Sequence, residues 1–276
     1  MQRKTKVGYQ GAKGAYSHKA SKALFKNAEH IGFETFEELT DALCEGRIDK
    51  AVMPISNSNA GRVFSAHNLI FEKNLYIVDE FFLRVEHNLL ARNRDIKNIK
   101  YAYSHPQALA QSSKFLRKNK LQEAAFSDTA LAAKFVSEQD RDDIAAIASD
   151  LAAKEYGLQI VAKNIENDKD NTTRFVVLAR QIKIPTTKTN VITSVFFITK
   201  NIPAALYKAL GGFATENINL LNIESFVPMK RNGRAKFYLE FEAHPEQENA
   251  KRALDELKFY SEELRVLGVY KERKHR

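Results

Sequence analysis

Residues 171–178 read N-T-T-R-F-V-V-L and join a polar cluster directly to an apolar run. The preceding residues, 164–170, are polar and acidic, which is typical of a loop, whereas 175–178 are typical of a buried strand. Two hydroxyls, an amide and a guanidinium therefore stand where a loop enters a strand, a position from which a rigid scaffold directs groups at a ligand. Because Arg174 offers a planar pair of donors, this junction predicts a carboxylate site. A solvated polar turn is the alternative.

The same alternation of apolar runs and helical segments extends from residue 6 to about residue 180. We expect strands at 7–10, 31–36, 51–55, 101–103, 124–126, 144–147 and 175–178. We expect helices at 15–26, 106–116, 129–136 and 150–156. This order predicts an α/β domain with mostly parallel strands, enough for two small sheets. The extended segment 82–91 would carry the chain into a second lobe, and 162–170 would bring it back.

Residues 181–190 are polar with one proline, which predicts a linker. Beyond it the pattern is strand, helix, strand, strand, helix, strand, over 191–199, 203–215, 219–227, 235–243, 246–258 and 263–270. Leu206, Leu210 and Phe213 fall on one face of the first helix, and Asn232-Gly233 is typical of a hairpin turn between the middle strands. The C-terminal part is therefore predicted to be a ferredoxin-like βαββαβ unit.

The composition is that of a globular protein, with 276 residues, 44% of them hydrophobic and 28% charged, so two domains with real cores are expected. The net charge of +9 suits an anionic small molecule, and no finger, RNP1 or helix-turn-helix pattern predicts a nucleic-acid partner. No apolar run is long enough for a membrane span, and the basic start lacks the apolar segment of a signal peptide. A single cysteine excludes an internal disulfide, so we expect a cytoplasmic protein.

Three further polar clusters follow expected strands, at 8–17 (G-Y-Q-G-A-K-G-A-Y-S), 54–61 (P-I-S-N-S-N-A-G) and 103–111 (Y-S-H-P-Q-A-L-A-Q). The first offers backbone N–H groups to an anion, with a tight strand–helix turn as the alternative. The second stands where ligands bind in α/β sheets, with an Asx-turn as the alternative. In the third, Ser104 is an expected N-cap. The seven histidines form no metal-binding spacing, so we expect no metal.

In this order the polar clusters resemble the prephenate dehydratase family, together with A-A-I-A-S-D-L-A-A-K-E-Y-G-L at 145–158 and N-T-T-R-F at 171–175. The C-terminal unit resembles the ACT regulatory domain that follows in that family. The match covers nearly the whole chain. No chorismate-mutase helical domain precedes residue 6, so we expect a monofunctional enzyme.

The resemblance implies a lyase that decarboxylates and dehydrates prephenate, a dianion, to phenylpyruvate in L-phenylalanine biosynthesis, without metal or organic cofactor. It implies a two-lobed, periplasmic-binding-protein-like catalytic domain at 1–182, with lobe one at about 1–82 and 165–182 and lobe two at about 83–164. An ACT domain would occupy 191–276. The alternatives are an arogenate dehydratase and a non-catalytic amino-acid-sensing binding protein. The resemblance also implies phenylalanine as effector and a homodimer or homotetramer.

Matching the family motifs residue by residue makes Thr173 the catalytic hydroxyl. Substrate contacts are then expected from Asn57, Ser104, Gln111, Thr172, Arg174 and Phe175. Ser17, Ser56 and Asp128 are expected to support them. The regulatory site would use Ala205, Leu206, Asn219, Leu220, Glu224 and Ser225. Departures from the family are Ser56 in place of the usual Glu, Ala204 in place of Gly, and Phe226 in place of Arg, and the last two predict weak inhibition by phenylalanine.

Overall fold

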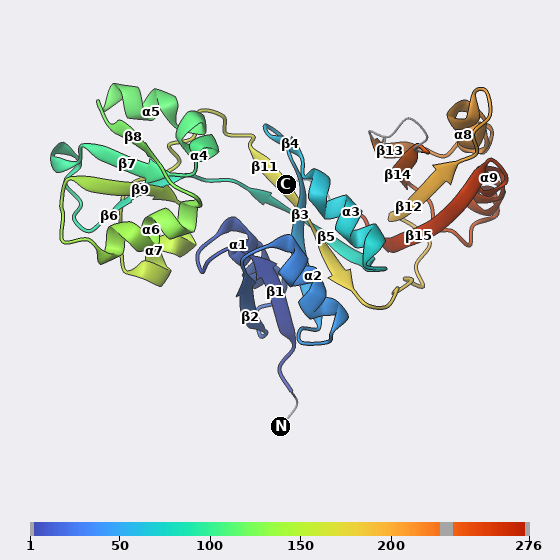
Figure 1. The fold of residues 1–276 in the computed structure, drawn as a ribbon, viewed down its shortest axis with the longest axis horizontal. Helices are drawn as coiled ribbons and strands as arrows, with labels where there is room; N and C mark the ends of the chain where they lie inside the picture. The colour runs from blue at the N-terminus through green and yellow to red at the C-terminus, as the bar shows by residue number, and fades with distance from the viewer. Residues whose placement is uncertain (1–2, 227–233, 274–276) are drawn as a thin grey trace. The chain divides into compact units, whose positions relative to one another are not determined.

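The computed structural model describes residues 3–226 and 234–273, so the expected Asn232-Gly233 turn lies outside the described residues. The chain forms two compact units (Figure 1). The first comprises Met1–Phe64 and Phe81–Phe175, and the second comprises Ser65–Glu80 and Val176–Arg276. Two strands, β5 (Tyr76–Arg84) and β11 (Thr172–Ala179), have residues in both units.

The first lobe of the first unit is built on parallel strands in the order β2-β1-β3, with β11 next to β3. The central strand β1 is buried along its middle because α1 and α2 flank this sheet. Val7, Val52 and Phe175 belong to its apolar core. The elements are β1 (Lys6–Gln10), α1 (Tyr16–Leu24), β2 (Glu29–Phe33), α2 (Phe36–Cys44), β3 (Lys50–Asn57) and the short β4 (Gly61–Arg62).

The second lobe holds a five-stranded sheet in the order β10-β6-β9-β7-β8. Strand β7 runs parallel to both neighbours, whereas β6 runs antiparallel to β9 and β10. The strands are β6 (Asn88–Ala91), β7 (Tyr101–Ser104), β8 (Gln122–Ala125), β9 (Ile144–Ala148) and β10 (Gln159–Ala162). The helices are the 3-10 turn η1 (Ile96–Asn98), α4 (Pro106–Gln111), α5 (Ser113–Lys118), α6 (Thr129–Glu138) and α7 (Asp150–Tyr156).

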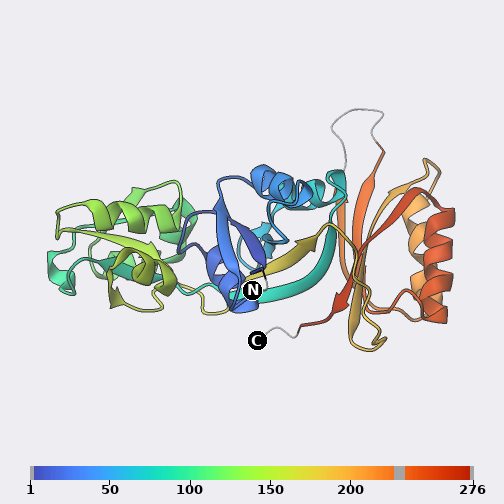
Figure 2. The same ribbon diagram turned by 90° about the horizontal axis from the view of Figure 1, so that it is seen from below.

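The second unit contains the expected βαββαβ module, with strand order β13-β14-β12-β15 and antiparallel pairing throughout. Figure 2 shows its two helices, α8 and α9, on the same face of the sheet. The helix α3 (Phe64–Glu72) also belongs to this unit, and Phe71 stacks on Phe196 with ring centroids 3.6 Å apart. The elements are β12 (Val191–Thr199), α8 (Ala205–Thr215), β13 (Leu220–Phe226), β14 (Lys236–Phe241), α9 (Glu248–Phe259) and β15 (Ser261–Lys271).

The expected fold class, a two-lobed α/β domain of periplasmic-binding-protein type followed by a ferredoxin-like module, is confirmed. Several details differ from the expectation, among them strand β10 (Gln159–Ala162), which was not expected. The pattern gave no helix at α3 and no strand start at Tyr76. The segment 82–91 contains two strands that are separated by residues 85–87. The expected helix 106–116 is interrupted at Ser112, whose φ of −113° and ψ of 10° are not helical. No helix among the described residues has the length and apolar character needed to cross a membrane.

Candidate active site

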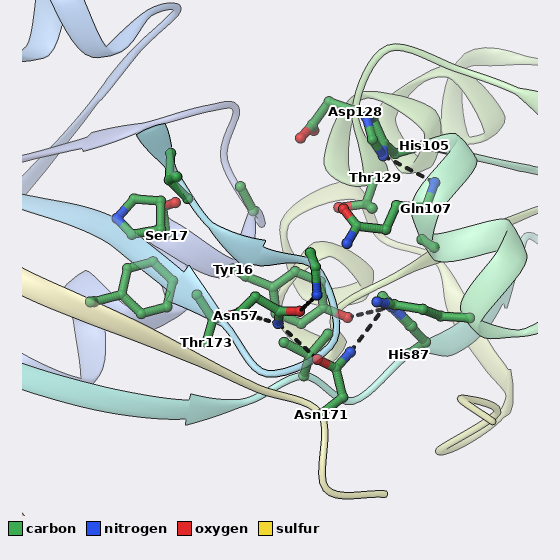
Figure 3. A pocket seen from close by; sticks show the side chains of 18 of the residues that line it. Tyr16, Ser17, Asn57, His87, His105, Gln107, Asp128, Thr129, Asn171 and Thr173 are labelled. Atoms are coloured by element: carbon green, nitrogen blue, oxygen red, sulfur yellow. Dashed lines mark hydrogen bonds between the residues drawn. The ribbon is translucent and has the colours of Figure 1, made fainter. Parts of the chain in front are cut away.

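A pocket of about 310 Å³ lies in the first unit, and side chains from both lobes line it. Figure 3 shows Tyr16, Asn57 and Thr173 on one side, with Gln107 and Thr129 across from them. The full lining comprises Gln10, Ala15, Tyr16, Ser17, Pro54, Asn57, Ala60, Gly61, Arg62, Val63, Val85, His87, His105, Gln107, Ala108, Gln111, Asp128, Thr129, Asn171, Thr173 and Phe175.

The strand–helix turn at Gly14 is fixed against the second lobe. Gly14 has a φ of +88°, and a Cβ atom there would lie 2.6 Å from the Cα of Ala152, so this close approach requires glycine. The Ser149 hydroxyl donates to the Gly14 carbonyl at 2.6 Å. These contacts place Tyr16, the first residue of α1, at the pocket wall.

Asn57 is the last residue of β3, and its amide has a defined orientation. Its Oδ1 accepts from the backbone N–H groups of Asn59, at 3.0 Å, and Ala60, at 2.8 Å. Its Nδ2 must therefore be the donor to Asn171 Oδ1, at 2.7 Å, and to Thr173 Oγ1, at 2.9 Å. Because the Thr173 oxygen accepts this hydrogen bond, the hydroxyl proton of Thr173 remains available as a donor in the pocket.

The alternation of side chains along β11 divides the residues at the start of the strand. Thr173, the predicted catalytic hydroxyl, and Phe175, a predicted substrate contact, both line the pocket. Thr172 and Arg174 do not line it, because successive side chains of a strand point to opposite faces. The Arg174 guanidinium instead lies 5.8 Å from the ring centroid of Phe82. The cationic side chain in the pocket lining is that of Arg62, on β4.

A chain of hydrogen bonds continues from Asn171 along the pocket (Figure 3). Asn171 Nδ2 donates to Gln111 Oε1 at 3.2 Å, and His87 Nε2 lies 2.9 Å from the same oxygen. The Tyr16 hydroxyl lies 2.8 Å from His87 Nδ1 and 2.8 Å from the Glu86 carbonyl, two acceptors for its single proton when Nδ1 is unprotonated. The chain joins α1 of the first lobe to α4 of the second through the connection between β5 and β6.

Burial shifts the pKa values of His87 and Tyr16, the two ionisable groups in this series of hydrogen bonds. His87 is 2% exposed, and desolvation lowers the pKa of its imidazole, against an upward contribution from its hydrogen bond to Gln111. Desolvation also raises the pKa of Tyr16 well above its ordinary value, with a further upward contribution from the Glu166 carboxylate. Both groups are therefore neutral near pH 7. Neither is a charged anchor for a substrate there.

Ser104 is placed behind the pocket. Its side chain is fully buried and its hydroxyl donates to the Ile147 carbonyl at 2.6 Å, so it is neither in the lining nor the N-cap of α4. The N-cap is His105, whose Nδ1 accepts from the Gln107 backbone N–H at 3.2 Å, and both of these residues line the pocket. Proline at the first helical position leaves no N–H to satisfy there.

The three supporting residues have separate positions. Ser17 lines the pocket, whereas Ser56 lies on β3 outside the lining. Asp128 lines the pocket and is the N-cap of α6, because its Oδ1 accepts from the N–H groups of Ala130 and Leu131.

Sequence reasoning missed Tyr16, Arg62 and His87 as pocket residues, and it named the Asn171 amide at the polar junction without assigning it a contact. Tyr16 and Asn171 lie inside segments that already carried the family resemblance, so their polar groups were visible there. His87 is a single histidine in the middle of the extended segment 82–91, and only its burial distinguishes it from a surface residue.

In the second unit, the predicted regulatory residues begin at α8. Ala204 precedes this helix with φ 57° and ψ 29°, the left-handed region that glycine adopts most readily. Ala205 is the first residue of α8. Leu206 and Leu220 pack against the apolar core of the module.

The other predicted regulatory residues point in different directions. Asn219 Nδ2 donates to Glu242 Oε2 at 3.1 Å. Glu224 is buried with its Oε2 3.7 Å from His67 Nδ1 on α3. Ser225, the next residue of β13, is exposed and points to the opposite face of the strand.

Comparisons with known proteins give a consistent result. The family model described as prephenate dehydratase matches residues 7–183. An Arabidopsis thaliana protein named arogenate dehydratase/prephenate dehydratase 2, chloroplastic, is 42% identical over 97% of this chain and 73% of its own length. A structure titled as a novel type of quorum quenching acylase is 37% identical, with a TM-score of 0.92 over 97% of this chain and 98% of that one.

A second solved structure is prephenate dehydratase in complex with L-Phe from Arthrobacter aurescens. It is 26% identical, with a TM-score of 0.88 over 97% of this chain and 90% of that one. The relative and the solved structure match along almost the full length, and the polar pocket lies inside the region 7–183 that the family model matches. This chain therefore belongs to the prephenate dehydratase family.

Proposed function

We propose that this protein is a prephenate dehydratase, a lyase that converts prephenate to phenylpyruvate. The observation that carries the proposal is the hydroxyl of Thr173, whose oxygen accepts from Asn57 and whose proton is thereby directed to another acceptor in the pocket. A donor in that position suits a reaction in which negative charge develops on a departing oxygen.

The proposed step needs little covalent chemistry from the protein. The prephenate dianion takes up one proton and yields the phenylpyruvate anion, carbon dioxide and water. The ring carboxylate leaves as carbon dioxide, its bonding electrons enter the ring, and the 4-hydroxyl leaves, so that the ring becomes aromatic. Thr173 is too weak an acid to protonate the departing oxygen before cleavage. It acts as a positioned hydrogen-bond donor in a site from which the lobes exclude water.

A dianionic substrate needs charged or N–H donors for its carboxylates. We assign the charged contact to Arg62, because its side chain is in the pocket lining. The amides of Gln107 and Gln111, on α4, also line the pocket. Arg174, which sequence comparison suggested for this task, stays a competing proposal, and the two arginines can be tested separately.

The test is to mix the purified protein with prephenate and follow the absorbance of phenylpyruvate. Formation of product well above the spontaneous rate, and loss of most of this rate in Thr173→Ala, is the expected result. A wild-type rate equal to the spontaneous one would refute the proposal. It would favour a non-catalytic amino-acid-sensing protein, which calorimetry with phenylalanine would then identify.

Arogenate is the second candidate substrate, because the Arabidopsis relative is named for both activities. Arogenate carries an amino group where prephenate carries a keto group, and the reacting ring is the same. The ratio of kcat/KM for the two substrates, measured on one preparation, decides between them. We expect prephenate to have the higher value, and a higher value for arogenate would reassign the enzyme.

We further propose that the module after residue 190 is an ACT domain that mediates allosteric regulation by phenylalanine. The L-Phe complex of the Arthrobacter aurescens relative supports an amino-acid effector. The proposed domain boundaries remain 1–182 and 191–276. The proposed contacts are Ala205, Leu206, Asn219, Leu220, Glu224 and Ser225.

We also propose a homo-oligomer, at least a dimer, in the cytoplasm. In the order β13-β14-β12-β15, strand β13 stands at an edge, and Leu221 and Ile223 on it are 40% and 43% exposed. Sedimentation should give a dimer or tetramer for the wild type and a smaller species for Ile223→Lys. Phe259→Lys, at an exposed residue of α9, should keep the wild-type mass. A monomeric wild type would contradict the proposed oligomer. The proposed cytoplasmic location is tested separately, by cell fractionation.

A further inference from the structure

We infer that His87 is a positioning residue that fixes the orientation of the Gln111 amide, so that Gln111 presents its NH₂ group to the bound anion. The inference rests on the proposed function for the nature of the substrate. The hydrogen-bond chain on which it depends is formed by the protein's own side chains.

The orientation of this chain is determined at Asn57. Two backbone N–H groups donate to Asn57 Oδ1, so Asn57 Nδ2 faces Asn171, and Asn171 must offer its oxygen. Asn171 Nδ2 is then the donor to Gln111, which must in turn offer Oε1. Each amide thereby fixes the next, although nitrogen and oxygen of an amide have nearly the same shape.

The same logic determines the tautomer of His87. Because Gln111 Oε1 is an acceptor, the His87 nitrogen 2.9 Å away must carry a proton, which makes Nε2 an N–H donor. In neutral His87 the other nitrogen, Nδ1, is then unprotonated, so it can only accept from the Tyr16 hydroxyl, whose single proton is shared between Nδ1 and the Glu86 carbonyl, each 2.8 Å away. The ring is 2% exposed and held at both nitrogens, so its orientation is well defined.

This arrangement leaves one part of Gln111 for the substrate. Its oxygen takes hydrogen bonds from His87 and Asn171, which uses both lone pairs. Its two N–H groups remain, and the residue lines the pocket. An amide that presented its oxygen instead would repel a carboxylate, so His87 contributes to anion binding without touching the anion.

Two substitutions test the roles of the two ring nitrogens of His87 separately. His87→Gln places an amide N–H near the position of Nε2, toward Gln111, whereas His87→Asn places its amide near Nδ1, toward Tyr16. We expect His87→Asn to raise KM for prephenate by roughly tenfold or more, with a smaller change in kcat, because a ground-state contact is lost. We expect His87→Gln to stay within about threefold of the wild-type KM.

His244→Gln is the matched control for the loss of a buried histidine. His244 is 1% exposed, and both of its ring nitrogens are hydrogen-bonded, but it belongs to the second unit. Its substitution should lower thermal stability and leave KM unchanged. Equal KM values for His87→Asn and His87→Gln would overturn the inference, whether both are raised or both are normal.

A double-mutant cycle tests whether His87 acts through Gln111. In a Gln111→Leu background, His87→Asn should add less than about threefold to KM, because no amide remains to be oriented. Independent, multiplying effects would show that His87 acts by another route, and would refute the inference.

A spectroscopic measurement tests the inference without any activity. In ¹⁵N NMR of histidine-labelled protein, with His87→Gln used to assign the signal, His87 should show a protonated Nε2 and an unprotonated Nδ1 at neutral pH. The opposite tautomer would overturn the inference even if prephenate is the substrate. If prephenate is not turned over at all, the proposed function is refuted, but the NMR measurement still tests the predicted tautomer of His87.

Discussion

Asn57 donates a hydrogen bond of 2.9 Å to the hydroxyl oxygen of Thr173, and this single contact makes Thr173 a donor to whatever occupies the pocket. Residue 57 ends β3 and residue 173 lies in β11, so 116 positions of sequence separate the two groups. The two strands bring them together because β3 and β11 are neighbours in the sheet.

The first prediction concerns this pair. Thr173→Ala should lower kcat by on the order of 10²-fold with a smaller change in KM, because the lost donor acts mainly in the transition state. Thr173→Ser should retain more activity. Asn57→Asp keeps the shape but offers only acceptors, so it should turn the Thr173 proton away from the substrate and lower kcat similarly. A change below about threefold in Thr173→Ala, measured by steady-state kinetics, would show that the assignment is wrong.

The second prediction compares two arginines. Arg62→Ala should raise KM for prephenate strongly, by roughly ten- to a hundredfold, because a charged hydrogen bond to a carboxylate acts in ground and transition states alike. Arg174→Ala should have the smaller effect on KM, because its side chain lies outside the pocket lining, near Phe82. Arg62→Lys is the conservative control. A larger increase in KM for Arg174→Ala than for Arg62→Ala would identify Arg174 as the residue that binds the carboxylate.

The third prediction concerns the stability of the turn at Ala204. Its φ of 57° is unfavourable for a residue with a Cβ atom, so Ala204→Gly should raise the free energy of unfolding by about 0.5–1 kcal/mol. The matched control is Ala214→Gly, at an exposed helical position of α8, which should lower it by about 1 kcal/mol. Urea denaturation measures both. Changes of the same sign would show that the turn is unstrained.

The fourth prediction concerns phenylalanine. Ala204 adds a methyl group and Phe226 removes a guanidinium relative to the family pattern, so we expect phenylalanine to inhibit weakly or not at all in the micromolar range. Titration calorimetry with parallel activity assays tests this. Low-micromolar binding with matching inhibition would refute it. If the prediction is correct, the double variant Ala204→Gly/Phe226→Arg should bind phenylalanine more tightly than the wild type.

The fifth prediction concerns pH. Burial lowers the pKa of His18 to about 4, below the ordinary value of 6.5. Between these two values the unfolded chain binds more protons, so the stabilising contribution is complete above pH 6.5 and is lost as the pH falls toward 4.

His18→Asn isolates this contribution. An Asn oxygen can replace Nδ1 as acceptor for the Gly14 N–H, at 3.0 Å in the wild type, but does not titrate. Free energies of unfolding measured from about pH 7.5 to pH 4.5 should therefore fall more steeply for the wild type than for the variant. Parallel curves would show that His18 contributes no pH dependence.

Much of the fold was predictable because its signals are local. The βαββαβ order after residue 190 and the alternation before residue 180 follow from periodicity within short windows. Helix α3 was missed because its apolar residues contact other parts of the second unit that lie far away in sequence, as Phe71 does in stacking on Phe196. The break at Ser112 was missed because the flanking residues have ordinary helical character.

The sequence by itself determined the family, the fold class and the polar clusters, because these depend on residue types at fixed spacings. Only the tertiary structure decided which side chains enter the pocket. Arg174 and Thr172 do not line the pocket, because side chains alternate along a strand. Ser104 does not line it either, because its hydroxyl is buried and donates to the Ile147 carbonyl. The series of hydrogen bonds that links Asn57 to His87 through Asn171 and Gln111 is the clearest case. Its polarity depends on donors and acceptors contributed by segments far apart in sequence, and such pairing exists only once the chain has folded.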